Sequence, residues 1–213
     1  KVYGDNPNKL KIIEKEKRWE LNKQDKYFKG IGEKFSIDEC THSFFGVSKT
    51  YADLIVQEYG KNVGLKTVCF RAGCVTGPNH SSAKLHGFLS YLVKLSLTKK
   101  KYSLIGYKGK QVRDNLHSYD LANCFWEFYK KPKKGEVYNI GGGRFSNCSI
   151  LEALDLVESI AGFKIKREIV KKPRVGDHIW YISNLNKFKK HYSGWKQKYN
   201  TKKIIEELIE NQI

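Results

Sequence analysis

The sequence predicts an α/β protein with a largely parallel sheet. Segments in which apolar residues recur at helical spacing alternate along the chain with short runs rich in β-branched residues, and this alternation is typical of strand–helix–strand units. Hydrophobic residues make up 40% and aromatic residues 13% of the 213 residues, which is enough to form a buried core. No run approaches the roughly 18 consecutive apolar residues of a membrane-spanning helix, so we expect no membrane contact.

The first third of the chain predicts an irregular segment, a helix and a strand. Residues 1–40 contain a turn at 5–8 (DNPN) followed by many charged residues, which favours irregular structure. A helix is expected over 43–59, ended by Gly60. The β-branched run at 66–70 (KTVCF) predicts a buried strand.

The middle of the chain predicts a second helix over 84–97 and a strand over 102–105. Ser118 is expected to cap a third helix. The apolar side chains expected on the inner face of that helix are Leu121, Ala122, Phe125, Trp126 and Tyr129.

The last third predicts a strand over 136–140, followed by a tight turn at Gly141–Gly143. Ser149 and Glu152 have the spacing of a capping box, which predicts a helix that ends at Gly162. A strand over 164–170 and a final helix over 201–209 complete the expected elements.

The formal net charge of +18 would attract any polyanion. However, lysines dominate the excess and are spread along the chain, whereas base and phosphate recognition favours arginine, of which there are six. No zinc-finger, RNP or basic-zipper pattern is present. We therefore expect a solvated lysine-rich surface rather than a nucleic-acid interface, and a small anionic ligand fits the charge equally well.

Five cysteines are scattered along the chain without a CxxC pair. An odd number of separated cysteines argues against a disulfide framework and against a zinc site. The sequence therefore predicts no metal and a reducing, cytoplasmic location.

A possible catalytic pair lies in the first predicted helix. Phe45 and Lys49 are four residues apart and so lie on one helix face. Short-chain dehydrogenases place a tyrosine and a lysine at this spacing, where the lysine holds the nicotinamide ribose and lowers the pKa of the phenol.

Further segments resemble that family in its extended form. They are, in chain order, 2–4 (VYG), 70–78 (FRAGCVTGP), 112–122 (VRDNLHSYDLA), 137–143 (VYNIGGG), 174–177 (RVGD) and the pairs Asn186-Lys187 and Gly194-Trp195. Because these matches keep their order across nearly the whole chain, the sequence resembles the NAD-dependent sugar-nucleotide epimerase/dehydratase family. The runs at 70–80 and 109–114 are most similar to its CDP-paratose/tyvelose 2-epimerase branch.

The resemblance implies the second half of a Rossmann-like parallel sheet plus a small α/β substrate-binding domain. Residues 1–75 and 114–143 would form the partial NAD-binding domain, and residues 76–113 and 144–213 the sugar-nucleotide domain. No G-x-G-x-x-G motif follows a predicted strand. By the resemblance, the chain begins near the fifth strand, and that loop would belong to a missing first half.

The resemblance also implies roles for individual residues. Lys49, Arg71 and Cys74 would contact the NAD cofactor, although many relatives have a substrate-binding asparagine where this chain has Cys74. The residues implied at the nucleotide-sugar substrate are Asn79, Arg113, Arg174 and Asp177. Arginine suits this role because its planar fork pairs with phosphate oxygens. The alternatives are a salt bridge from Arg113 to Asp114 or Asp120, a surface pair between Arg174 and Asp177, and a merely solvated Lys49.

Phe45 departs from the family pattern, because a phenyl ring cannot exchange a proton. Either another group replaces the phenol, for which His42 and His80 are the candidates, or the chain is a relative that binds sugar nucleotides without catalysis. A polyanion-binding module is a third alternative.

The reaction implied by the resemblance is epimerisation of a nucleotide sugar, by transient oxidation to a ketone and return of the hydride. The full-length protein would be a homodimer. The helix that precedes the Lys49 helix in the family's dimer interface is not in this chain. We therefore expect the 213 residues alone to be inactive, to expose apolar surface and to fold poorly.

Overall fold

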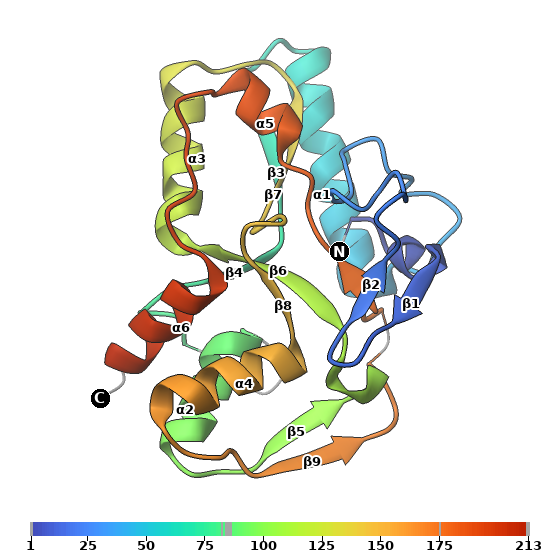
Figure 1. The fold of residues 1–213 in the computed structure, drawn as a ribbon. Coiled ribbons are helices and arrows are strands. Elements are labelled where there is room, and N and C mark those ends of the chain that lie inside the picture. Colours follow the sequence, from blue (N-terminus) through green and yellow to red (C-terminus); the bar gives the residue numbers. More distant parts are fainter. Residues whose placement is uncertain (1, 82, 84–86, 175, 212–213) are drawn as a thin grey trace.

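The computed structural model describes residues 2–81, 83, 87–174 and 176–211. It has an α/β fold in which three of the four groups of paired strands follow one another along the long axis of the molecule, with the fourth, an N-terminal hairpin, beside them (Figure 1). The first group lies between α1 and α3, the second joins the two ends, and the third packs against α2, α4 and α6. The expected α/β class is confirmed.

The first group is a two-stranded parallel sheet, β3 (Val68–Ala72) and β7 (Glu136–Ile140). Helix α1 (Ser43–Lys61) covers one face and α3 (Ser118–Lys130) the other, and the short helix α5 (Asn186–His191) packs beside β7. The sheet thus holds two helices apart and presents the ends of its strands to the middle of the molecule.

The second group is built on β6 (Val112–His117). This strand pairs in parallel with β4 (Cys74–Thr76) and with β10 (Trp180–Tyr181), and antiparallel with β8 (Asn147–Ser149). Because β4 follows β3 after a single glycine, the chain passes directly from the first group of strands into the second.

The third group pairs β5 (Tyr102–Ile105) in parallel with β9 (Arg167–Val170). Helices α2 (Phe88–Leu97), α4 (Ile150–Ala161) and α6 (Thr201–Glu210) pack together beside it and bury a large apolar cluster. No helix in the described part of the chain is long and apolar enough to cross a bilayer.

The N-terminal segment is more ordered than expected. It contains a 3₁₀ turn, η1 (Asn6–Lys9), and a hairpin of β1 (Ile12–Glu14) and β2 (Trp19–Leu21), while a second turn, η2 (Tyr107–Gly109), lies near this hairpin. The expectation of an irregular segment was therefore wrong in part. The hairpin forms because the indole of Trp19 and the carboxylate of Glu20 bond to distant residues, Tyr107 and Trp180, which local patterns do not reveal.

Several expected elements are confirmed. The strands over 102–105 and 136–140 have the expected bounds. The capping box of Ser149 and Glu152 is present, and Gly162 ends α4 in the left-handed conformation, at φ 76°.

Other element bounds differ. The strand expected at 66–70 runs from 68 to 72, the one expected at 164–170 begins only at 167, and the helix expected from 84 begins at 88. Residues 84–86 lie outside the described part of the chain.

The expected role of Gly60 is wrong, because this residue lies inside α1, which continues to Lys61. A Cβ at Gly60 would collide with the backbone nitrogen of Gly135. The glycine therefore permits close packing of the helix against the turn before β7 instead of ending the helix.

Two expectations about α3 are also wrong. The residue that caps this helix is His117 rather than Ser118, because the His117 Nδ1 accepts the backbone N–H of Tyr119 at 3.0 Å. The helix is also rotated relative to the expected inner face. Its buried residues are Asp120 and Cys124, since the Asp120 carboxylate accepts the backbone N–H groups of residues 198 and 199.

The aromatic residues expected inside α3 are consequently exposed. Phe125, Trp126 and Tyr129 are 50%, 56% and 73% exposed. Helix α1 shows the same reversal, since its buried residues are Gly46, Asp53 and Gly60. The predicted exposure of apolar surface is thus present in the structure.

Candidate functional site

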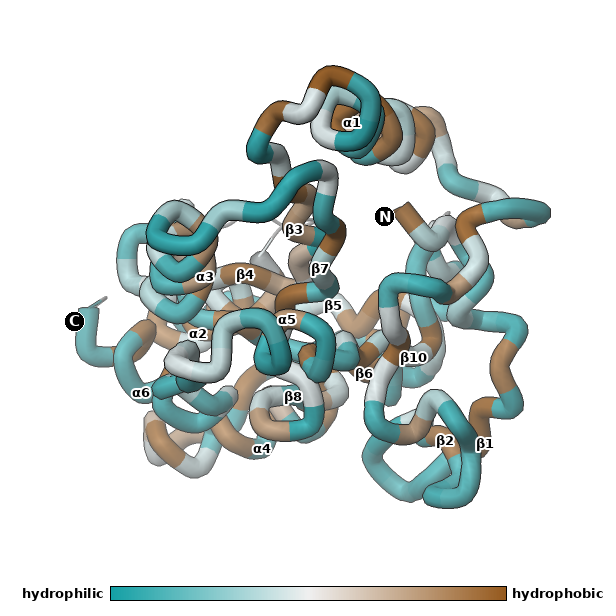
Figure 2. The backbone as a smooth tube through the Cα atoms, turned by 90° about the horizontal axis from the view of Figure 1, so that it is seen from above, coloured by the Kyte–Doolittle hydropathy of each residue, from teal (hydrophilic) through white to brown (hydrophobic). Residues whose placement is uncertain are grey.

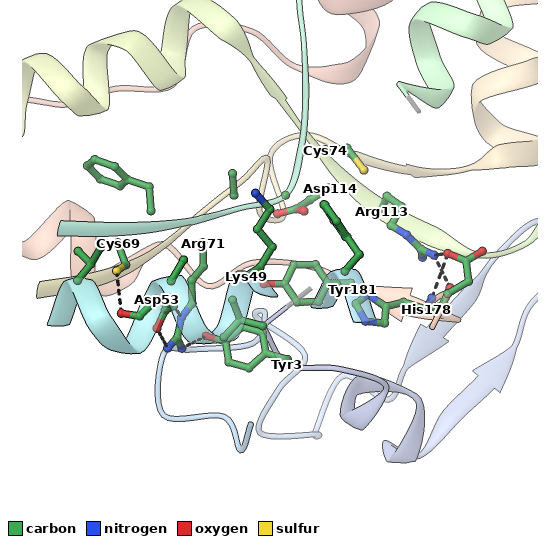
Figure 3. A pocket seen from close by; sticks show the side chains of 18 residues that line it. Tyr3, Lys49, Asp53, Cys69, Arg71, Cys74, Arg113, Asp114, His178 and Tyr181 are labelled. Carbon is green, nitrogen blue, oxygen red and sulfur yellow. Dashed lines mark hydrogen bonds and ion pairs between the residues drawn. The ribbon is translucent and has the colours of Figure 1, made fainter. Parts of the chain in front are cut away.

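The larger of two neighbouring cavities has a volume of about 560 Å³ and lies between α1, β3 and the chain around residues 177–181 (Figure 3). Its wall also includes Arg113 and Asp114 from β6 and Tyr3 from the N-terminal segment. The cavity therefore lies where the first two groups of strands meet, and elements from distant parts of the sequence contribute to it.

One stripe of α1 faces this cavity. Phe45, Lys49, Asp53 and Val56 line it at spacings of four, four and three residues, which places them on one helix face. The Lys49 Nζ lies 5.3 Å from the centroid of the Phe45 ring. The predicted juxtaposition of positions 45 and 49 is present, and it brings an exposed ammonium group to the cavity wall.

A buried ion pair fixes α1 against β3. The Arg71 guanidinium donates to both carboxylate oxygens of Asp53, at 2.9 and 2.7 Å, and to the Tyr3 hydroxyl at 3.0 Å. Burial opposes the charge on Arg71, but the hydrogen bonds that it donates to Asp53 outweigh this effect and raise the pKa of the guanidinium. The N–H groups of Arg71 therefore donate to other groups of the protein, and this side chain is not positioned to bind a ligand.

Tyr3 completes this network and is not poised to act as a base. Its hydroxyl donates to the Asn139 Oδ1 at 2.8 Å. Burial raises the pKa of the Tyr3 phenol, and the neighbouring Arg71 only partly opposes the shift. The phenol therefore stays protonated near neutral pH and links the N-terminal segment to β3 and β7.

Two arginines converge on one carboxylate at the other end of the cavity. The Arg113 Nη2 lies 2.6 Å from the Asp177 Oδ1 and also donates to the His178 carbonyl, while the Arg174 Nη2 lies 3.4 Å from the same carboxylate. Burial acts to raise the pKa of Asp177, but the Arg113 and Arg174 charges outweigh it and hold the pKa below its ordinary value. Asp177 is thus ionised at neutral pH and leaves the pair of guanidinium groups with a net positive charge.

A smaller cavity of about 130 Å³ lies on the other side of these arginines. Three aromatic residues, Phe88, Tyr91 and Tyr102, contribute to its wall. The wall also includes Cys74, Arg113, Arg174 and Asp177. Cys74, Arg113 and Asp177 also line the larger cavity. The two cavities therefore meet at a positively charged junction.

Burial also acts on two thiols and one carboxyl group of the larger cavity. Burial raises the pKa of the Cys74 thiol to about 11 and of the Cys69 thiol to about 12. It also raises the pKa of Asp114, against the hydrogen bonds from the backbone N–H groups of Ser183 and Gly143. Neither thiol is therefore a ready nucleophile at neutral pH.

The structure brings most of the predicted site residues together. Phe45, Lys49, Arg71, Cys74, Arg113 and Asp177 line the larger cavity, and Arg174 lines the smaller one. The Arg113 carboxylate partner is Asp177, rather than the Asp114 or Asp120 considered from the sequence.

Three predicted site residues line neither cavity. Asn79 is exposed. The His80 Nδ1 lies 3.1 Å from the Thr76 hydroxyl, and the His42 Nε2 lies 2.8 Å from the Ile37 carbonyl. The histidine that does line the larger cavity is His178, whose Nε2 lies 2.6 Å from the Gly4 carbonyl.

The sequence reasoning missed several residues of the site, including Tyr3, Asp53, His178 and Tyr181. Asp53 could have been found, because it lies four residues after Lys49 and therefore on the same helix face. His178 and Tyr181 follow the predicted substrate segment, but nothing in their spacing identifies them. Within the described ranges, no three His, Cys, Asp or Glu side chains gather into a metal site.

Comparisons with known proteins found a matching family and similar chains. The model of the NAD dependent epimerase/dehydratase family matches residues 29–141. CDP-paratose 2-epimerase of Salmonella typhi is 25% identical over 221 residues, which cover 99% of this chain and 62% of that enzyme. dTDP-glucose 4,6-dehydratase of Escherichia coli is 26% identical over 177 residues, which cover 67% of this chain and 48% of that enzyme.

Solved structures show the same fold. dTDP-glucose 4,6-dehydratase from Bacillus anthracis, in complex with NAD, superposes with a TM-score of 0.76 at 25% identity and covers 99% of this chain and 58% of that one. UDP-glucose 4-epimerase from Thermus thermophilus, also a complex with NAD, gives a TM-score of 0.77 at 20% identity and covers 99% and 60%. The chain thus spans about 60% of the length of relatives that it matches end to end.

Proposed function

Because the chain belongs to the NAD dependent epimerase/dehydratase family, we propose that it is the sugar-nucleotide-binding part of an NAD-dependent epimerase. The observation that carries the proposal is the junction of the two cavities, where Arg113 and Arg174 face the same carboxylate. A nucleoside diphosphate sugar has an aromatic base, a diphosphate and a polar ring in a row. The smaller cavity, the guanidinium pair and the larger cavity follow one another in the same order.

Each part of this ligand has a chemically suitable partner. The aromatic side chains of the smaller cavity offer ring faces and edges to a base. The two guanidinium groups offer paired donors to diphosphate oxygens. Arg113 is held by Asp177 and two backbone carbonyls, so it acts as the fixed contact. Arg174, whose side chain is 42% exposed, acts as the contact that adjusts to the ligand.

The residues present fit NAD at one end of the cofactor. Lys49 brings its ammonium to the cavity wall beside the open end of β3 and would hold the nicotinamide ribose. The G-x-G-x-x-G loop that cradles a dinucleotide pyrophosphate does not occur in this sequence. When bound, NAD supplies the acceptor and the donor of a hydride.

The proton that accompanies such a reaction is not carried by position 45, because Phe45 has no exchangeable proton. Lys49 still places a positive charge at the cavity wall, where it favours an oxygen that develops negative charge. Of the tyrosine and lysine that the family places at these two positions, the chain therefore retains the lysine and its positive charge but lacks the phenol.

Within the family we propose a CDP-linked hexose as the substrate, with inversion at C2, because a CDP-paratose 2-epimerase is among the relatives that align over 99% of this chain. We also propose that the whole protein acts as a homodimer and in the cytoplasm, where the five free cysteines stay reduced.

Calorimetric titration of the chain with CDP tests the nucleotide site. Arg113→Lys keeps the charge but loses the planar fork, so we expect CDP affinity to fall about tenfold, which corresponds to about 1.4 kcal/mol. Arg167→Lys is the matched control, because Arg167 lies on β9 and lines neither cavity. Arg174→Ala, at a more exposed position, gives a second reading if Arg113→Lys folds poorly. Unchanged affinity in both site variants, or no CDP binding to the unmodified chain, would contradict the proposal.

A further inference from the structure

The end of the molecule at which β3 and β7 begin carries many lysines. It is formed by the end of α1 with the loop after it, the loop between α3 and β7, and α5, which lie together at the top of Figure 1. We define the lysine cluster as the seven lysines Lys61, Lys66, Lys131, Lys133, Lys134, Lys189 and Lys190. The far end of β3 leads to the candidate site, because Gly73 and Cys74 line the larger cavity. The cluster and the site therefore lie toward opposite ends of this strand.

Contacts between the three segments join them into one surface. A Cβ on Gly64, in the loop after α1, would lie 3.5 Å from the Lys134 Nζ in the loop after α3. The hydroxyl of Tyr192, the residue directly after α5, donates to the Lys131 carbonyl at 3.1 Å. The lysines of the cluster, which are far apart in the sequence, are therefore neighbours in space.

The charge of this cluster is not compensated by the protein. None of the seven lysines pairs with a carboxylate within the ranges that the structure describes, and all except Lys133 are exposed. Two nearby carboxylates are used by other lysines, since Glu127 pairs with Lys130 at 2.7 Å and Glu136 with Lys187 at 2.6 Å. This end of the molecule therefore has a net positive charge.

His191, the last residue of α5, lies in the resulting positive potential. Burial lowers the pKa of its imidazole, and the charge of Glu136 opposes this shift. The charges of Lys133, Lys187 and Lys190 lower the pKa further. Lysines from two separate segments thus act on the same side chain, which agrees with their position in one cluster.

Exposed apolar side chains lie among these lysines. Val63 and Leu65 are 64% and 50% exposed, in the short loop between Lys61 and Lys66. Tyr129, in the last turn of α3, is also exposed. Figure 2 looks onto this end of the molecule and shows that the segments around α3 and α5 are mostly hydrophilic. The surface therefore combines positive charge with a few outward-facing apolar side chains.

This combination favours lipid headgroups over nucleic acid. Lysine is a point charge, whereas base recognition favours the planar fork of arginine, and no arginine occurs in the segments 61–66, 130–134 and 186–192. An anionic lipid surface attracts clustered lysines, and its headgroup region accepts apolar side chains. The two aliphatic side chains at the tip of the loop after α1 suit such a surface, since they offer no ring on which a base could stack.

We propose that the lysine cluster docks on a membrane that contains anionic phospholipids, with Val63 and Leu65 placed between the headgroups. The expectation of no membrane contact rested on the lack of a spanning segment, and a surface contact needs none. Because β3 leads from the cluster to the cavities, a docked molecule holds its candidate site away from the bilayer and open to solution.

Co-sedimentation with vesicles tests the docking. The probe is large unilamellar vesicles of phosphatidylglycerol and phosphatidylcholine in equal parts, with vesicles of phosphatidylcholine alone as the neutral reference. We expect the chain to partition about a hundredfold more strongly onto the anionic vesicles, because several lysines meet the surface together. Raising the salt concentration should release it.

Paired charge reversals locate the contact on the molecule. Lys66→Glu combined with Lys134→Glu should weaken partitioning onto the anionic vesicles about tenfold or more. Lys99→Glu combined with Lys100→Glu is the matched control, because it changes the net charge equally on the turn between α2 and β5, at the opposite end of the molecule. This control should weaken partitioning by less than about threefold, since distant charges are screened.

A second pair of variants tests the apolar part of the contact without changing the charge. Val63→Ser combined with Leu65→Ser should weaken partitioning about tenfold, because two aliphatic side chains lose their burial among the headgroups. Tyr51→Ser combined with Leu54→Ser removes exposed apolar side chains from the middle of α1 and serves as the matched control, with partitioning unchanged.

Three results would overturn the proposal. The first is equal partitioning onto anionic and neutral vesicles. The second is an equal loss in the two charge-reversal variants, which would mean attraction to the net charge of the whole chain. The third is unchanged partitioning of the Val63→Ser, Leu65→Ser variant together with equally tight binding of duplex DNA, which would assign the cluster to nucleic acid.

Two further measurements keep the test decisive. CDP affinity should be unchanged in all of these variants, which shows that they are folded and separates a failure of the docking from a failure of the nucleotide site. Lys189→Glu combined with Lys190→Glu, on α5, should weaken partitioning as much as the first pair of charge reversals and replaces that pair if it folds poorly. Loss of CDP binding with normal partitioning would count against the proposed function alone.

Discussion

The two ends of the molecule differ in how far they complete their own cores. At the end formed by α2, α4 and α6, each helix buries an apolar face against the other two. At the end formed by β3 and β7, α1 extends over 19 residues but buries only Gly46, Asp53 and Gly60. The first end is a closed core, whereas at the second end a buried cluster forms with α3 and α5 and α1 adds little apolar burial to it.

The comparison shows what holds α1 in place where few of its side chains are buried. Helix α4 is fixed by burial of Leu154 and Val157, which needs no specific partner. Helix α1 is fixed by the hydrogen-bonded ion pair of Asp53 and Arg71 and by close packing at Gly60. Where apolar burial is scarce, the position of a helix depends on a few polar contacts.

The largest effect is expected for Asp53→Ala. This change leaves the Arg71 guanidinium buried without its carboxylate, and removing one partner of a buried pair costs about 3–5 kcal/mol. Amide exchange should accelerate throughout α1 and β3 while α4 and α6 keep their protection.

Asp155→Ala is the control, since Asp155 makes an exposed pair with Lys17 and such pairs contribute about 0–1 kcal/mol. Equal acceleration in α4 and α1 after Asp53→Ala would mean that the two ends form one cooperative unit and that the comparison fails.

The same contrast explains which elements the sequence could predict. Helix α4 has a local signal at each end, a capping box at its start and a glycine at its end. These two signals were sufficient to predict where the helix begins and ends. Strand β6 was missed because Arg113, Asp114 and Asn115 are polar residues whose burial depends on partners far along the chain. The face of α3 was misjudged because Asp120 bonds backbone groups near residue 198, which turns the aromatic residues outward.

Residues of the candidate site could be predicted from the sequence where they belong to a recognisable motif. Lys49 was identified from its spacing to Phe45, and Arg113 and Asp177 from the ordered matches, and all three line the larger cavity. The replacement bases were not predictable, because the positions of His42 and His80 in space depend on loops that precede α1 and α2. Proximity in the sequence to Phe45 and Gly77 did not place either histidine at the cavity.

A smaller effect is expected for Ser149→Ala at the closed end. The Ser149 hydroxyl accepts the Glu152 N–H at 3.1 Å and donates to the Lys17 carbonyl at 2.6 Å. Loss of an N-cap costs about 1 kcal/mol. Chemical denaturation should show this loss, and the exchange of α1 amides should remain unchanged. Ser149→Thr, which can keep both bonds, is the matched control. A loss that also accelerates α1 would show that the closed end supports the open one.

The smallest effect on stability is expected for Trp126→Lys at the open end. Trp126 is more than half exposed, and surface substitutions of this kind usually change the free energy of unfolding by no more than about 0.5 kcal/mol. Its effect should appear instead in self-association, because an exposed aromatic patch beside an unpaired strand promotes contacts between copies. Sedimentation velocity across a concentration series should show less association than in the unmodified chain. Lys130→Ala, at the charged rim of the same helix, should not reduce it. A loss of several kcal/mol in Trp126→Lys would mean that this aromatic patch already belongs to a core of the isolated chain, and the two ends would then differ less than the exposed surface indicates.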